Sequence, residues 1–329
     1  MSHLRAVPRA DEQPRPRSGS ATSVRVEAPG RVPLFVSRVP SGDGGEPTSS
    51  TVYQAVRIIN AVTARRQAAD AHGAVTLTPE DADQEPLGDN APAARAARAL
   101  ADAVGVTEGV DLLLRRRVPR GCGLGGGSAQ AAATLVACNQ LWGTGLSQAE
   151  LLGIAAGLGT DVGFPLIGAC AVGHGEGRCL NPLMTCGSYQ WVLALPREPL
   201  EPTEVYARHD ALTRADGAAR PPAAEPVREA PDALTTALRA GDAAALAPVL
   251  HNDLQETVLS LRPALADVIA LAQQAGALRA LVAGTGPAVA ALVAEPGTAA
   301  RVTRALRASG LIASAVRVDA PVAGARVVG

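Results

Sequence analysis

Apolar and polar residues alternate, or apolar residues run together, in four short stretches near the beginning of the chain. Both patterns are typical of β-strands. A proline–glycine pair at residues 29–30 separates the first two stretches and predicts a turn between them. We therefore expect strands at residues 22–28, 31–39, 50–58 and 73–78.

A helical pattern appears after residue 90. Asn90 followed by Pro92 can begin a helix, which the alanine-rich residues after it continue. Residues 109–114 predict another strand. Residues 128–142 are apolar almost all round, which predicts a helix buried on every side.

A capping box predicts where the next helix begins. Ser147 and Glu150 have the spacing at which a serine caps a helix and a glutamate three residues later caps the serine. Gly157 and Gly159 end this helix.

Strands and helices alternate again in the second half. Residues 189–195 predict a strand, and the alanine- and proline-rich residues 214–232 predict a loop or inserted linker. A helix–strand–strand–helix–strand series then predicts an α+β sandwich with one helical layer. Its elements are a helix at 263–275, a strand at 278–283, the loop GTGP at 284–287, a strand at 288–294, a helix at 298–308 and a strand at 311–318.

The length of 329 residues predicts two domains, which we place at residues 23–186 and 187–329. Apolar residues make up 47% of the chain but aromatic residues only 2%, so alanine, valine and leucine must build the cores. Residues 1–22 are rich in arginine, proline and serine and lack an apolar segment, which predicts a disordered tail rather than a signal peptide. No apolar run is long enough to span a bilayer.

The charges and cysteines narrow the function classes. The net charge of −1 gives no overall attraction to nucleic acid or to an anionic membrane. All 30 basic residues are arginine, so any role that usually falls to lysine falls to arginine here. The five cysteines form no CxxC pair, and neither they nor the histidines have the spacing of a metal site. We expect a cytoplasmic protein that is a monomer or homodimer.

The segment PRGCGLGGGSA at residues 119–129 is the main candidate for a functional site. Gly121, Gly123 and Gly126 satisfy the dinucleotide fingerprint GxGxxG, but several predicted strands precede them and the next acidic residue is Glu150, inside the capping box. A lysine-containing phosphate loop is excluded because the chain has no lysine. A purely structural glycine hairpin remains open, and so does a phosphate cradle of another kind.

In such a cradle, glycines let successive N–H groups point at an anion. A helix that begins near Ser128 adds free N–H groups and a favourable dipole. The Ser128 hydroxyl can add a donor or a metal ligand. Several charge-assisted hydrogen bonds of this kind can hold a triphosphate without lysine.

The glycine segment and the helix after it resemble the phosphate loop of the GHMP kinases, and most of all that of the 4-diphosphocytidyl-2-C-methyl-D-erythritol kinases of the non-mevalonate isoprenoid pathway. Further motifs follow in the family's order across residues 24–319. They are APGRVPLF at 28–35, VYQAV at 52–56, LGTDVGF at 158–164, HNDLQ at 251–255 and AGTGPAVAAL at 283–292.

The resemblance implies a two-domain GHMP kinase fold, with a mixed α/β nucleotide domain followed by a ferredoxin-like α+β domain. It also implies transfer of the γ-phosphoryl group of ATP to a small-molecule alcohol, with Mg²⁺, in the cleft between the domains. Asp161 matches the catalytic aspartate, and Arg31 stands where the family has a lysine. Tyr206 resembles an aromatic residue of the substrate side, and Ser128 is the candidate Mg²⁺ ligand. The ATP-binding residues are then Pro119, Arg120, Gly121, Cys122, Gly123, Leu124, Gly125, Gly126, Gly127, Ser128 and Ala129.

Several positions depart from the family pattern on the acceptor side. Pro33 replaces an asparagine and Gly163 a proline, while Glu46 and Pro47 stand where the family has an aromatic–histidine pair that holds cytosine. A GHMP kinase for another alcohol, homoserine-like or sugar-like, therefore stays open as an alternative. So does a relative that binds nucleotide without catalysis.

Overall fold

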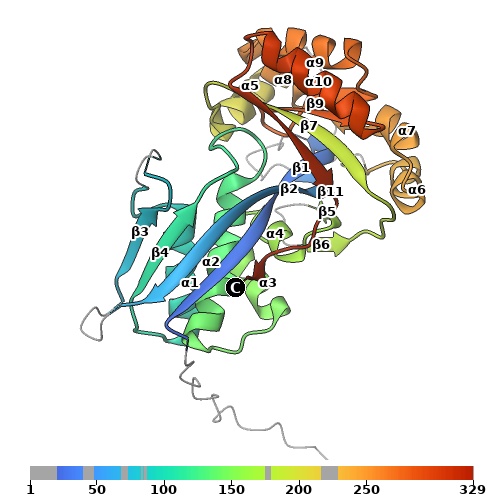
Figure 1. The fold of residues 1–329 in the computed structure, drawn as a ribbon. Coiled ribbons are helices and arrows are strands. Elements are labelled where there is room, and N and C mark those ends of the chain that lie inside the picture. The colour runs from blue at the N-terminus through green and yellow to red at the C-terminus, as the bar shows by residue number, and fades with distance from the viewer. Residues whose placement is uncertain are drawn as a thin grey trace, which may run out of the picture.

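Two β-sheets with helices packed on them make up the computed structural model of the chain (Figure 1). Most strands of the larger sheet come from the first half of the chain and all strands of the smaller one from the second half, in agreement with the predicted α/β class. The structure describes residues 21–39, 48–67, 73–82, 84, 87–174, 179–215 and 229–328, so Glu46 and Pro47 lie outside the described residues.

Two long antiparallel strands form the centre of the larger sheet. They are β1 (Ser23–Val39) and β2 (Thr48–Arg66). Strand β4 (Val110–Arg115) pairs antiparallel with β2, and β3 (Val75–Pro79) pairs parallel with β4. The remaining strands are β5 (Cys170–His174), β6 (Cys179–Pro182), β8 (His251–Asn252) and β12 (Arg326–Val327).

The turn predicted at residues 29–30 is wrong, because β1 continues through this pair without a break. Pro29 pairs with Ile59 while Gly30 pairs with Val56, so β2 carries extra residues at this point. A β-bulge of this kind bends the strand without ending it. Buried apolar residues on both sides of the pair belong to the same sheet, and their burial keeps the strand continuous.

Helices cover one face of the larger sheet (Figure 1). The predicted buried helix is present and begins two residues earlier than expected, and the capping box at Ser147 and Glu150 is confirmed. The helices are α1 (Pro92–Val104), α2 (Gly126–Trp142), α3 (Gln148–Leu158) and the short α4 (Phe164–Ile167).

The smaller sheet has the strand order β11-β7-β10-β9, with every neighbouring pair antiparallel. Along the chain, helices follow the first and third of these strands, β7 and β10. This is the predicted ferredoxin-like α+β arrangement. Its strands are β7 (Tyr189–Leu195), β9 (Arg279–Val282), β10 (Val289–Val293) and β11 (Ser314–Ala320).

The helices of the second half include several that the sequence pattern did not predict. Helix α5 reaches residue 215 and α6 begins at residue 232, so both ends of the linker predicted at 214–232 are helical, and residues 216–228 lie outside the described part. No helix among the described residues is long and apolar enough to cross a membrane. The helices are α5 (Pro202–Ala215), α6 (Asp232–Ala240), α7 (Ala243–Leu246), a 3₁₀ turn (Ala247–Val249), α8 (Gln255–Leu261), α9 (Ala264–Gln274) and α10 (Pro296–Ala308).

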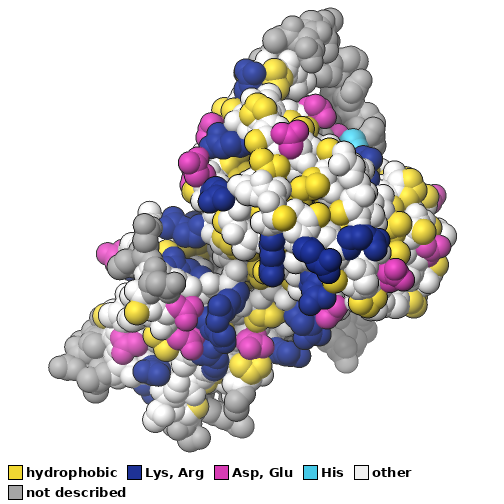
Figure 2. All heavy atoms as spheres, turned by 45° about the horizontal axis from the view of Figure 1, so that its top comes forward, with side chains coloured by type: hydrophobic (Ala, Val, Ile, Leu, Met, Phe, Trp, Pro, Cys, Tyr) yellow, Lys and Arg dark blue, Asp and Glu magenta, His cyan; other side chains and the backbone are white. Residues whose placement is uncertain are grey.

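The two halves are closely joined. One apolar cluster contains Val32 and Val52 of the larger sheet together with Trp191 and Leu281 of the smaller one. The chain end returns to the first half, where β12 pairs with β1. The boundaries at residues 22 and 186 stay predictions. Arginine and acidic side chains both lie on the face of the molecule seen in Figure 2.

Candidate active site

A glycine-rich loop joins β4 to α2 and runs between the two halves of the molecule. Gly121, Gly123 and Gly125 have φ angles of 55°, 80° and 75°, in the left-handed region that favours glycine. A side chain on Gly123 would also place its Cβ 1.9 Å from the carbonyl oxygen of Ala283. The loop therefore needs glycine both for its backbone and for its approach to the second half.

The loop leads directly into the N-terminus of α2. Gly125 occupies the N-cap position and provides no side-chain cap, so N–H groups of the first turn keep their capacity to bind a ligand. Gly127 and Ser128 line the adjoining cleft. Free N–H groups and the helix dipole together favour an anion at this end of the helix.

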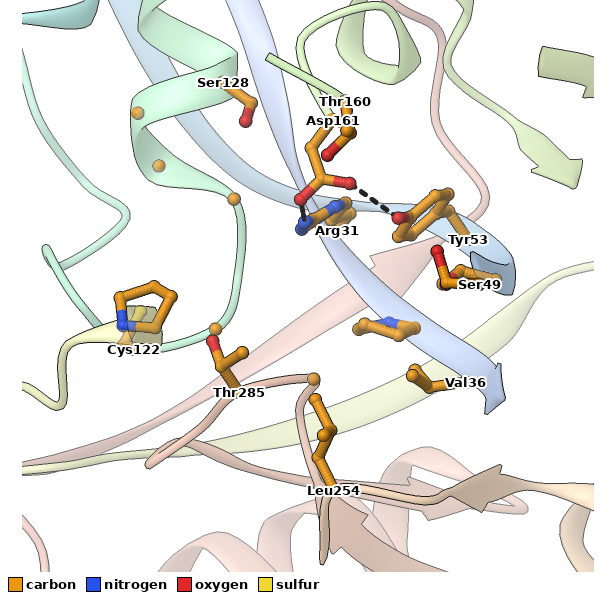
Figure 3. A pocket seen from close by; sticks show the side chains of 18 of the residues that line it. Arg31, Val36, Ser49, Tyr53, Cys122, Ser128, Thr160, Asp161, Leu254 and Thr285 are labelled. Carbon is orange, nitrogen blue, oxygen red and sulfur yellow. Dashed lines mark hydrogen bonds and ion pairs between the residues drawn. The ribbon is translucent and has the colours of Figure 1, made fainter. Parts of the chain in front are cut away.

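The cleft beside the loop has a volume of about 270 Å³ and is lined from both halves of the chain (Figure 3). The first half contributes the loop, three strands (β1, β2 and β5) and the turn after α3. The second half contributes α5 and the turn between β9 and β10. Outside the loop, the lining residues include Arg31, Arg38, Tyr53, Asp161, Tyr206 and Thr285.

Three polar side chains meet in the cleft (Figure 3). Arg31 of β1 donates through Nη2 to Oδ2 of Asp161, with which it forms an ion pair. The hydroxyl of Tyr53, on β2, donates to the other carboxylate oxygen at 2.6 Å. The Arg31 guanidinium also lies 4.7 Å from the centre of the Tyr53 ring, within range of a cation–π contact.

The contacts among Arg31, Tyr53 and Asp161 determine the protonation state of each of these side chains. Burial disfavours the Asp161 carboxylate, yet the Arg31 charge and the hydrogen bonds from Tyr53 and Arg31 hold its pKa below the ordinary value. Burial and the charge of Asp161 raise the pKa of Tyr53, so its hydroxyl stays protonated. Burial opposes the charge on Arg31, but Asp161 keeps the pKa of Arg31 above its ordinary value. The site therefore holds a carboxylate, a guanidinium and a neutral phenol.

The other two nitrogens of the Arg31 guanidinium, Nε and Nη1, are buried and make no hydrogen bond within the described residues. A Cβ on Gly125 would lie 3.0 Å from Nη1, which places this edge of the guanidinium against the glycine loop. Buried guanidinium nitrogens without partners are costly unless a ligand satisfies them. A phosphate on the loop is an anion of the required charge and size.

Comparison with known proteins decides the family. The model of the GHMP kinases N terminal domain matches residues 92–173, and that of the GHMP kinases C terminal domain matches residues 234–311. Two curated relatives are both named 4-diphosphocytidyl-2-C-methyl-D-erythritol kinase. The one from Thermobifida fusca is 42% identical over 93% of this chain and 99% of its own length. The one from Leifsonia xyli is 43% identical over 93% and 98%. This chain belongs to the GHMP kinases.

Solved structures share the fold of this GHMP kinase. A crystal structure of 4-(cytidine 5'-diphospho)-2C-methyl-D-erythritol kinase has a TM-score of 0.71 at 27% identity, with 91% of this chain and 99% of that chain covered. The homoserine kinase from Cytophaga hutchinsonii has a TM-score of 0.69 at 18% identity, over 94% and 98%. The second likeness supports the fold alone.

Most residues that the sequence singled out in this GHMP kinase line one cleft. Asp161, Arg31, Ser128, Tyr206 and the greater part of the glycine loop do so. Within the loop, the side chains of Leu124 and Ala129 are buried in the core, and that of Arg120 is exposed. These three do not line the cleft, and the roles of all the residues that the sequence singled out stay predictions.

One side of the cleft combines an arginine with an aromatic ring. The guanidinium of Arg38 lies 4.3 Å from the centre of the Tyr206 ring. Arg38 Nη2 also lies 3.8 Å from a carboxylate oxygen of Asp210, and Arg38 Nε is buried without a hydrogen-bond partner within the described residues. A cation and an aromatic ring therefore line this side of the cleft.

Sequence reasoning missed Tyr53 and Arg38. Both lie in strands whose apolar neighbours suggest only a sheet core. The partners that give them a polar role are distant in sequence, since Tyr53 contacts Asp161 and Arg38 contacts Tyr206. The alternation of strand residues shows which side chains share a face, but it does not show which helix or loop packs there.

Proposed function

We propose that this GHMP kinase transfers the γ-phosphoryl group of ATP to the hydroxyl of 4-diphosphocytidyl-2-C-methyl-D-erythritol and forms the 2-phosphate. The observation that supports it best is the Arg31–Asp161 pair, which lies beside a glycine loop with uncapped helix N–H groups. Relatives about 40% identical over nearly the whole chain carry the name of this kinase.

The loop and Arg31 hold the transferred group in this proposal. Backbone N–H groups at the start of α2 and the free edge of Arg31 bind phosphate oxygens. Phosphoryl transfer depends mainly on such positioning and charge stabilisation. Arginine stays charged throughout, because its pKa is too high for it to exchange a proton. Arg31 therefore acts as a fixed cation.

Asp161 accepts the proton of the attacking hydroxyl. Its carboxylate is ionised at neutral pH because its pKa lies below the ordinary value. A weakly basic carboxylate suits a reaction in which the proton leaves late, when the new oxygen–phosphorus bond has formed. Bound Mg²⁺ would neutralise phosphate charge. Among the residues of the cleft, we propose the Ser128 hydroxyl to hold it.

Arg38 and Tyr206 hold the acceptor in the same proposal. An acceptor with a diphosphate and a pyrimidine ring matches a guanidinium beside an aromatic ring. We further propose that the enzyme works in the cytoplasm as a monomer or homodimer. Glu46 and Pro47, which stand where the family holds cytosine, lie outside the described residues.

A phosphoryl-transfer assay tests the function. Purified protein is incubated with ATP, Mg²⁺ and one alcohol at a time, and products are identified by mass spectrometry and ³¹P NMR. The acceptors are diphosphocytidyl-methylerythritol, homoserine and mevalonate. Turnover of the first supports the proposal, and preferential turnover of another assigns a different acceptor. ATP binding by calorimetry without turnover of any acceptor would indicate a non-catalytic relative.

A further inference from the structure

Tyr53 holds the second oxygen of the Asp161 carboxylate. Its side chain is only 8% exposed. The ring packs against Phe164 at 5.1 Å between centroids, with an interplanar angle of 41°, and the Arg31 guanidinium lies 4.7 Å from the ring centre. Phe164 follows Asp161 by three residues. Tyr53 therefore contacts both the carboxylate and the segment that carries it.

The packing of the ring does not explain the hydroxyl. A phenylalanine at this position would keep the contacts with Phe164 and Arg31. The hydroxyl instead makes a hydrogen bond of 2.6 Å to Asp161 Oδ1. Hydrogen bonds to a charged acceptor are roughly twice as strong as those between neutral groups. This bond therefore acts on the carboxylate itself.

Two contacts restrain a carboxylate in a way that one cannot. Arg31 reaches only Oδ2, which leaves the carboxylate free to turn about its Cβ–Cγ bond. A second bond from a different strand, at Oδ1, fixes the plane of the group. Reacting groups must be held closely for efficient transfer, since small misplacements reduce rates strongly.

We propose that Tyr53 is a positioning residue that orients the Asp161 carboxylate through its hydroxyl, a role that rests on the proposed function. The groups that act on Asp161 are Arg31 from β1, Tyr53 from β2 and Tyr206 from α5. Removal of the Tyr53 hydroxyl takes away a hydrogen-bond donor that stabilises the ionised carboxylate of Asp161. The pKa of Asp161 then rises, and the acid limb of kcat/KM moves to higher pH.

Tyr53→Phe is the test, with Tyr189→Phe as its matched control. Tyr189 is also buried, but its hydroxyl donates to the backbone oxygen of Ala237, remote from the cleft. The acid limb of kcat/KM is measured for both variants. The Asp161 carboxyl is titrated separately by NMR with ¹³Cγ-labelled aspartate, assigned by its loss in Asp161→Asn.

We expect both midpoints to rise by about one pH unit in Tyr53→Phe, a tenfold change in proton affinity, and to stay in place in Tyr189→Phe. Unmoved midpoints in a folded Tyr53→Phe protein would overturn the proposal. A moved NMR midpoint without turnover of any acceptor would leave the Tyr53–Asp161 contact supported and remove the proposed function instead.

A second variant covers the case in which Tyr53→Phe does not fold. The chain has only three tyrosines, so 3-fluorotyrosine in a Tyr189→Phe, Tyr206→Phe background labels Tyr53 alone. Fluorine makes the phenol a stronger donor, so the NMR midpoint of Asp161 should fall relative to the same background without fluorine. An unchanged midpoint contradicts the proposal.

Discussion

Gly125 lies where the glycine-rich loop meets Arg31. Its φ of 75° makes any side chain unfavourable by about 1 kcal/mol, and an added Cβ would press on Arg31 Nη1. We expect Gly125→Ala to weaken ATP binding at least tenfold by calorimetry. Gly145→Ala is the control, because Gly145 has a similar φ of 71° with open space around it. Equal ATP affinity in the two variants would argue against the loop as the phosphate site.

Asp161 offers a second prediction at this scale. Asp161→Asn keeps the shape and removes the base, so turnover should fall by about two to four orders of magnitude with little change in ATP affinity. Arg31 loses its charged partner, so the melting temperature should also fall. Asp102→Asn, at an exposed position of α1, controls for the loss of a charge. Full activity in Asp161→Asn would show that Asp161 has a structural role and not a catalytic one.

The sequence predicted individual residues unevenly. Asp161 and Arg31 stand out because a compact motif surrounds each, and the structure brings the two side chains together as an ion pair. Tyr53 also lies in a motif, VYQAV, but that motif indicates only a strand, and a tyrosine among apolar strand residues is usually part of a core. Its role depends on one contact with a residue 108 positions away.

At the scale of elements, Asn60 connects β2 by hydrogen bonds to the residues on both sides of the glycine-rich loop. Its side chain is fully buried, accepts from the N–H groups of Arg117 and Val118 at 2.8 and 2.9 Å, and donates to the carbonyl of Gly126 at 3.1 Å. Asn60 thereby fixes both the end of β4 and the start of α2. Neither attachment is visible in the hydrophobic pattern.

Asn60→Ala should destabilise the protein by about 3 kcal/mol, because it leaves three backbone groups without partners. Urea denaturation measures this change. Asn60→Asp keeps the two accepted bonds but places a carboxylate oxygen against the buried Gly126 carbonyl, so we expect a loss at least as large as in Asn60→Ala. ATP affinity should fall in the same order. A loss below about 1 kcal/mol in Asn60→Ala would mean that water replaces the side chain.

The elements themselves follow from the sequence except where tertiary contacts override local signals. The capping box marks the start of α3 correctly because both partners lie within one turn. The proline–glycine pair in β1 is misleading because its turn signal competes with the burial of the residues on either side. Helix α5 has a weak apolar pattern, and the short α6, although amphipathic, directly follows an alanine- and proline-rich stretch that favours a loop.

At the scale of the whole molecule, the cleft depends on how the two sheets are joined. The indole N–H of Trp191, on β7, donates to Oε1 of Gln54, on β2, at 2.9 Å, and both side chains are buried. Strand β8, from the second half of the chain, pairs with β1 beside Phe35 and Val36. The sequence predicts two halves but not these connections, which join residues more than 130 positions apart.

A shared core should make the two halves unfold together. The two tryptophans report on separate places, since Trp142 packs in the core of the first half and Trp191 in the cluster shared by both. In Trp142→Phe, fluorescence follows Trp191 alone, and in Trp191→Phe it follows Trp142 alone. For each variant we expect the fluorescence and far-UV circular dichroism midpoints in urea to coincide, as they do when a single cooperative transition includes both sheets. Comparison within one variant removes the effect of each substitution on stability. If the Trp191 signal changed at a lower urea concentration than the dichroism, the second half would unfold first, and the cleft would open before the larger sheet is lost.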